Sequence, residues 1–183
     1  MMEIMNTKIA NFMLFQAGWF ICVLGAANES GNLAVLITFS LVLLHLLTNQ
    51  RKVETGILII TISILGWAWD SILVQADLFN YSGVLSSDVA PLWIAAMWAI
   101  FATTIDSSMK WLERRYFMAL ILGAIFGPLA YYSASKLGAV EILVLPDALL
   151  IQSFAWAIFL PLMFWLNQIL YRTQLSIFKA SEK

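Results

Sequence analysis

Six long apolar stretches follow one another along the chain, separated by short segments that carry charged residues, Gly, Pro or Asn. Each stretch is close to the ~20 residues that an α-helix needs to cross the hydrocarbon core of a membrane. The predicted spans are residues 9–27, 33–48, 55–79, 91–112, 116–138 and 149–171. They account for nearly all of the 183 residues, so we expect one transmembrane domain and no soluble catalytic domain.

Composition supports this prediction, since 62% of the residues are hydrophobic and 11% are charged. Soluble domains have roughly 45–50% apolar and about 25% charged residues. A transmembrane β-barrel would show alternating segments of about 10 residues, whereas these stretches are apolar for longer. The sequence therefore predicts an all-α fold, a polytopic helical bundle of about six spans. It leaves open whether the second span, the shortest, crosses fully.

The Lys and Arg residues predict the orientation of the bundle, because basic loops stay in the cytoplasm. In a six-span arrangement, Lys136 is the only basic residue predicted on one side of the membrane. The other side holds the remaining basic residues, which are Lys8, Arg51, Lys52, Lys110, Arg114, Arg115, Arg172, Lys179 and Lys183. We therefore expect a multi-pass protein of a bacterial inner membrane with both termini in the cytoplasm.

A cleaved signal peptide is the alternative for the N-terminus, because Lys8 precedes an apolar run that ends in the small residues 25–27. The run is longer than the h-region of about 7 to 15 residues in such peptides. It also contains Asn11 and Gln16, which suit a helix that packs through polar contacts. We expect a retained helix.

Several partner and cofactor classes find no support in the sequence. The net charge of −1 and the scattered basic residues argue against nucleic acid. The single cysteine, Cys22, excludes an intrachain disulfide, and the single histidine, His45, has no carboxylate three or four residues away that would form a metal motif. We expect no metal site, and any cofactor is unknown.

Asp70 is the acidic residue predicted to lie deepest in the membrane. It follows Thr55 by 15 residues, or about 22 Å of helix, and Trp67 and Trp69 flank it. A carboxylate at this depth needs a partner, water or a proton. Asp70 is thus a candidate proton-binding group, with a structural role between helices as the alternative.

The fifth span carries Gly123 and Gly127 at the spacing that lets helices approach closely, followed by Pro128. Tyr131 and Tyr132 come next. A proline kink beside two tyrosines suggests a cavity, and the alternative is a simple packing seam. The candidate cavity residues are Asp70, Tyr131, Tyr132, Gln152, Trp67 and Trp69.

A second polar layer is expected near the cytoplasmic end of the bundle. Its candidate residues, at comparable depth on different spans, are Asp106, His45, Asn11, Asn167 and Gln168. A simpler alternative for Asp106 is an ion pair with Lys110, four residues later on the same helix.

Short motifs across nearly the whole chain resemble an uncharacterised family of bacterial inner-membrane proteins, catalogued as a domain of unknown function. They are Asn11-Phe12, Phe15-Gln16, Gly18-Trp19, Trp69-Asp70, Pro91-Leu92-Trp93, Met97-Trp98 and Gly127-Pro128-Leu129-Ala130-Tyr131. The resemblance implies six transmembrane helices and assigns no activity or catalytic residue.

Three functions remain open. The first is lipid-linked: binding or modification of a membrane lipid or hydrophobic small molecule in an intramembrane cavity. The second is a small proton-coupled transporter that uses Asp70 or Asp106. The third is a non-catalytic membrane assembly partner. A homo-oligomer is compatible with each of them.

Overall fold

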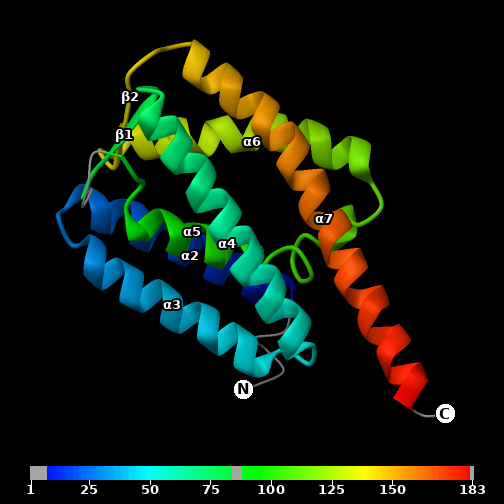
Figure 1. Cartoon of the computed structure of the whole chain (residues 1–183). Coiled ribbons are helices and arrows are strands. Elements are labelled where there is room, and N and C mark those ends of the chain that lie inside the picture. The colour runs from blue at the N-terminus through cyan, green and yellow to red at the C-terminus, as the bar shows by residue number, and fades with distance from the viewer. Residues whose placement is uncertain (1–7, 84–87, 182–183) are drawn as a thin grey trace.

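The computed structural model describes residues 8–83 and 88–181, with side chains described up to residue 172. The described chain forms a bundle of helices with one small sheet (Figure 1). In chain order its elements are α2 (Lys8–Ala27), α3 (Gly31–Thr48), α4 (Lys52–Gln75), β1 (Phe79–Tyr81), α5 (Leu92–Ala102), η1 (Lys110–Leu112), α6 (Tyr116–Lys136), β2 (Val140–Ile142) and α7 (Asp147–Ser181).

Five of the described helices, α2, α3, α4, α6 and α7, are long and apolar enough to cross a membrane. Many large apolar side chains point outward from the bundle, among them Leu36, Ile60 and Phe117. Such an outer surface suits lipid rather than water. The predicted all-α bundle is confirmed, and the chain is a multi-pass membrane protein.

The fourth predicted span is wrong as one continuous helix over residues 91–112. Helix α5 has 11 residues and ends at Ala102, and the chain continues in turns as far as η1. The hydroxyls of Thr103 and Thr104 each donate 2.7 Å hydrogen bonds to backbone carbonyls three residues back, which compete with the helical pattern. Both residues are buried in the bundle, where irregular backbone is protected from lipid. The second span, in contrast, is a continuous helix of 18 residues.

The third span ends earlier than the predicted residue 79. Helix α4 stops at Gln75, and Asp77 follows with a positive φ of 53°, a backbone conformation outside the helical region. Phe79 instead begins β1, which pairs with β2 in the antiparallel register Phe79↔Ile142 and Tyr81↔Val140. Alternation along β1 buries Phe79 and Tyr81 while Asn80 stays exposed.

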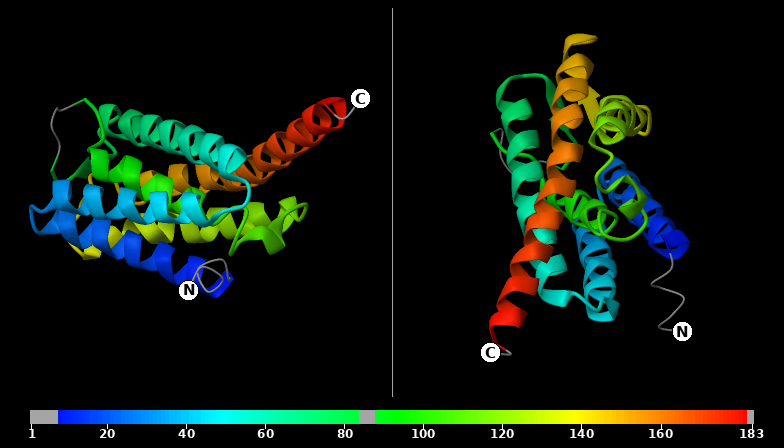
Figure 2. Two further views of the ribbon diagram at one scale, coloured as in Figure 1. Left: turned by 90° about the horizontal axis from the view of Figure 1, so that it is seen from below. Right: turned by 90° about the vertical axis from the view of Figure 1, so that its right-hand side faces the viewer.

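The two ends of the bundle differ in character. The sheet lies at one end, and both chain termini extend toward the other (Figure 2). At the end of the bundle opposite the sheet, the Arg51 guanidinium lies 4.5 Å from the centre of the Tyr171 ring. This contact joins the start of α4 to α7. The predicted cytoplasmic loops share this end, although Lys183 and the side chain of Lys179 lie outside the described residues.

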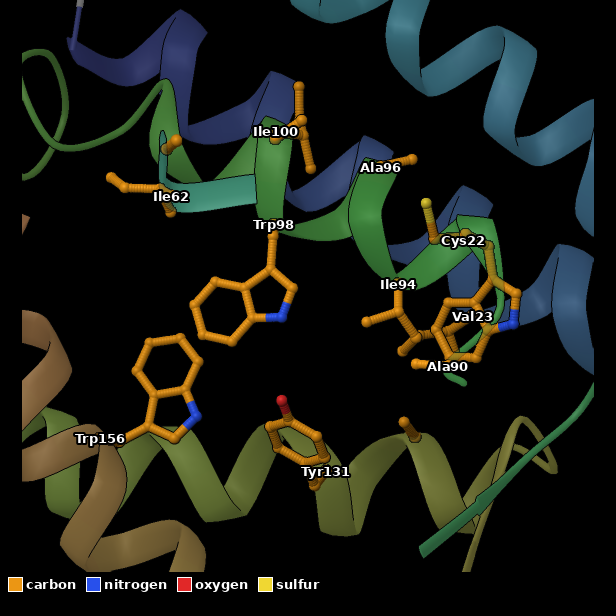
Figure 3. Close-up of a cluster of buried hydrophobic side chains, with 14 of the residues drawn as sticks. Cys22, Val23, Ile62, Ala90, Ile94, Ala96, Trp98, Ile100, Tyr131 and Trp156 are labelled. Carbon is orange, nitrogen blue, oxygen red and sulfur yellow. The ribbon is translucent and has the colours of Figure 1, made fainter. Parts of the chain in front are cut away.

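Two glycine contacts shape the centre of the bundle. A Cβ at Gly123 on α6 would overlap with the backbone carbonyl of Trp156 on α7, and a Cβ at Gly66 on α4 would overlap with the Trp98 indole. Trp98 and Trp156 stack on each other with centroids 4.8 Å apart and planes 10° from parallel (Figure 3). The glycine spacing in α6 therefore serves packing against α7 within the chain.

Candidate functional site

Asp70 lies at the centre of a buried cluster formed by four elements. Its side chain on α4 is 0% exposed. The Tyr81 hydroxyl from β1 donates to Oδ1 at 2.6 Å, and the Trp98 Nε1 from α5 donates to Oδ2 at 2.6 Å. The Tyr131 hydroxyl from α6 lies 2.8 Å from Oδ1 and 3.1 Å from Oδ2. Among the described residues no Lys, Arg or His lies within ion-pair distance of this carboxyl group.

Packing fixes the donors in place. Gly66, one turn before Asp70 on α4, leaves room for the Trp98 indole, which is 2% exposed. Trp156 covers the other face of that indole, and Figure 3 shows the Tyr131 hydroxyl directed toward both rings. The donors are thus aimed at the carboxyl group by rigid aromatic contacts rather than by flexible side chains.

Most of the candidate cavity residues belong to this cluster. Trp69 Nε1 donates to Gln152 Oε1 at 3.0 Å, and Gln152 interacts in turn with the Tyr131 hydroxyl. Trp67 lies elsewhere, since its Nε1 donates to the Ala90 carbonyl at 2.7 Å. The rings and the Gln152 side chain occupy the place where the sequence suggested a cavity, because Asp70, Tyr131 and Gln152 are all buried.

Sequence reasoning missed Tyr81 as a member of this site. The predicted spans 55–79 and 91–112 leave Tyr81 in the connection between them, but the buried face of β1 directs it inward. Burial and the neighbouring Asp70 raise the pKa of the Tyr81 hydroxyl well above its usual value, so the hydroxyl keeps its proton and donates. The alternation of Phe79, Asn80 and Tyr81 covers only three residues, which is too short to predict a strand from the sequence.

A groove of about 500 Å³ opens beside Tyr81 at the sheet end of the bundle. Its walls come from β1, β2, the end of α6 and the segment before α7, and they comprise Asn80, Tyr81, Ser82, Tyr132, Ser135, Lys136, Gly138, Val140, Glu141, Ile142 and Leu145. Tyr132, a predicted cavity residue, faces this groove and not the buried cluster. Tyr81 is a lining residue of the groove, and its buried hydroxyl donates to Asp70 in the interior.

The second polar layer forms at the other end, where α5 gives way to turns. Asn11 Nδ2 lies 3.5 Å from His45 Nδ1 and donates to the Thr103 carbonyl at 3.2 Å. The Ser108 hydroxyl donates to Asn11 Oδ1 at 2.7 Å. Because Asn11 donates toward Nδ1, the neutral His45 carries its proton on Nε2, an atom with no partner among the described residues.

Asp106 joins this end through Thr55, whose hydroxyl donates to Oδ2 at 3.0 Å. The expected ion pair between Asp106 and Lys110 is wrong, because the helix has already ended and four-residue spacing no longer brings the two side chains together. Asn167 and Gln168 are buried on α7, and no described hydrogen bond joins them to Asn11 or His45. Thr55 and Asp70 are separated by about 22 Å of α4, so the two acids occupy separate sites.

Comparison with known proteins gives one match. A family model described as "Protein of unknown function (DUF2878)" matches residues 8–162, from the first residue of α2 into α7. The match therefore includes every member of the Asp70 cluster. No curated protein and no solved structure matches the chain. The resemblance to an uncharacterised family is thus confirmed.

Proposed function

Because the chain belongs to the DUF2878 family of proteins of unknown function, we propose its role from the geometry of the site alone. The protein binds a lipid or a lipid-like hydrophobic molecule of a bacterial inner membrane. The polar part of that molecule occupies the groove beside Tyr81, and its apolar part lies along the outer surface of the bundle.

The observation that carries this proposal is the composition of the groove. One part of its wall is polar, with Ser135, Lys136 and Glu141, and another part is apolar, with Ile142 and Leu145. Its volume of about 500 Å³ lies within the roughly 300–1,000 Å³ of ligand pockets. A groove of mixed polarity at the end of a membrane-spanning bundle suits an amphiphile.

The Asp70 cluster supports the groove from beneath. Tyr81 lines the groove, and its hydroxyl donates a 2.6 Å hydrogen bond to Asp70. Binding of a lipid in the groove requires only that the hydrogen bond to Asp70 keeps Tyr81 in position.

The experiment is mass spectrometry of lipids and small molecules retained by the detergent-purified protein. Ser135→Phe places a ring in the groove, and Ser133→Phe is the matched control because Ser133 lies on the same helix without lining the groove. We expect a specific compound in the wild type and the control that is lost in Ser135→Phe. Retention of the same lipids in the same amounts by all three proteins would contradict the proposal.

Proton-coupled transport is the second candidate. It is favoured by the full burial of Asp70, which has no cationic partner within the described part of the chain. In proteoliposomes this candidate predicts that the wild type dissipates an imposed pH gradient in the presence of the retained compound. Asp70→Asn would abolish that flux. An assembly partner would show neither flux nor a specific compound.

A further inference from the structure

We propose that the groove recognises a head group that carries a phosphate and a primary ammonium a few ångströms apart, as in phosphatidylethanolamine. This inference rests on the proposed function and names the chemistry of its ligand. It derives from two opposite charges that line one groove without pairing with each other.

Lys136 supplies the positive charge. Of the described basic residues it alone lies at the sheet end of the bundle, in the last turn of α6. Its Nζ lies 4.9 Å from the centre of the Tyr132 ring, a cation–π contact that holds the ammonium group at the groove wall. No carboxylate of the described residues lies within 4.0 Å of it, so its charge is available to a phosphate.

Glu141 supplies the negative charge from β2. The Asn80 Nδ2 on the facing strand lies 3.5 Å from its Oε2 as a weak donor, and no cation of the described residues pairs with it. A ligand with only a negative charge would be repelled by Glu141, and one with only a positive charge would be repelled by Lys136. A zwitterion satisfies both groups.

The hydroxyls in the groove favour a primary ammonium over a quaternary one. The Ser135 hydroxyl donates to the Tyr132 carbonyl at 2.8 Å, and the Ser82 hydroxyl donates to the Gly138 carbonyl at 3.1 Å. Their protons are therefore engaged, and their oxygens remain as acceptors. An ammonium with N–H donors can use these acceptors and Glu141, whereas a trimethylated choline nitrogen cannot donate.

Native mass spectrometry can test this with three short-chain lipids of equal chain length. They carry ethanolamine, choline or glycerol on the phosphate. We expect the detergent-purified protein to retain the ethanolamine lipid about tenfold more than the other two, as one charge-assisted hydrogen bond would give. Soluble O-phosphoethanolamine serves as a fourth probe. If the protein binds this compound but none of the three lipids, the proposed head-group chemistry stands and the ligand is a free compound rather than a lipid.

Two variants separate the charges. Glu141→Gln should abolish the preference for ethanolamine over glycerol, and Lys136→Gln should weaken retention of all three lipids. Glu29→Gln, a charge removal outside the groove, is the control and should change nothing. Equal retention of the three lipids by the wild type would overturn this inference and leave the proposed function standing. Binding of none of the four probes would overturn this inference, whereas the proposed function is tested separately by the compounds that co-purify with the protein.

Discussion

Asp70 shows how one carboxyl group can be buried without a cationic partner among the described residues. Three donors from three different elements replace the water that the group would otherwise require. A buried acceptor of this kind is costly when a donor is removed, because the lost hydrogen bond has no substitute in the packed interior. The cluster therefore ties β1, α5 and α6 to α4.

Tyr81→Phe should lower the free energy of unfolding by about 1.5–3 kcal/mol, the range for a hydrogen bond to a charged group. The reason is that Asp70 Oδ1 loses its shortest contact while the ring still fills its space. Thermal unfolding in detergent measures the change. Tyr132→Phe is the matched control, since its hydroxyl makes no hydrogen bond within the described residues and its ring is half exposed. Equal stability of the two variants would contradict a supporting role for Tyr81.

At this scale the sequence predicted the grouping of Asp70 with Tyr131 and Gln152. It could not assign Tyr81 and Trp98 as the remaining donors. That assignment depends on the pairing of β1 with β2 and on the room left by Gly66, both of which are contacts between distant parts of the chain.

The close contact between helices α6 and α7 depends on glycine in α6, because a larger side chain there would overlap with Trp156. The backbone carbonyl of Trp156 fills the position of a Cβ at Gly123, and backbone cannot rotate away as a side chain can. The seam also holds Trp156 against Trp98, so its geometry extends to the Asp70 cluster.

Gly123→Ala should therefore separate α6 from α7 and lower the free energy of unfolding by about 1–3 kcal/mol, as for overpacking of a core. Gly56→Ala is the control on α4, where the nearest atom to the added Cβ is a Leu46 methyl group at an ordinary 3.8 Å. That change should be neutral or stabilising by about 0.4–1 kcal/mol. Chemical or thermal unfolding of both variants gives the comparison, and a stable Gly123→Ala protein would show that the seam can widen at little cost.

The broken fourth span shows the limit of hydropathy at the scale of elements. Residues 91–112 contain enough apolar side chains for a crossing helix, yet the run of hydroxyls from Thr103 to Ser108 competes for backbone hydrogen bonds. A mean hydropathy averaged over a sequence window does not reflect this competition for backbone hydrogen bonds. The tertiary contacts of Asn11 then stabilise the irregular segment.

The whole molecule has one end with the sheet and the groove and another with both termini. From the basic residues we predict that the sheet end faces the periplasm. A membrane-impermeant maleimide tests this in a Cys22→Ser background. In bacterial cells with a permeabilised outer membrane, Ala76→Cys at the sheet end should react, whereas Gln50→Cys should react only after the inner membrane is disrupted. The reverse pattern would place the groove in the cytoplasm.

For the molecule as a whole, apolar length and helical periodicity predicted the bundle and most of its helices. The small sheet, whose strands of three residues each were too short for a periodic signal, did not emerge from the sequence. That sheet forms much of the groove wall, so the proposed ligand site belongs to the part of the fold that only long-range pairing defines.

The arrangement of the Asp70 donors also bears on biosynthesis. The ribosome completes α4 before it has made Tyr81, Trp98 or Tyr131, so synthesis of the helix that carries the acid precedes that of all three donors. An unpartnered acid at the centre of an inserting helix costs about 2.5–3.5 kcal/mol on translocon scales, which is an upper bound for Asp70 in the last two turns of α4. The apolar residues of α4 must offset that cost alone until the later helices arrive. Truncated nascent chains that end before α6 should therefore be the forms most prone to removal by membrane proteases.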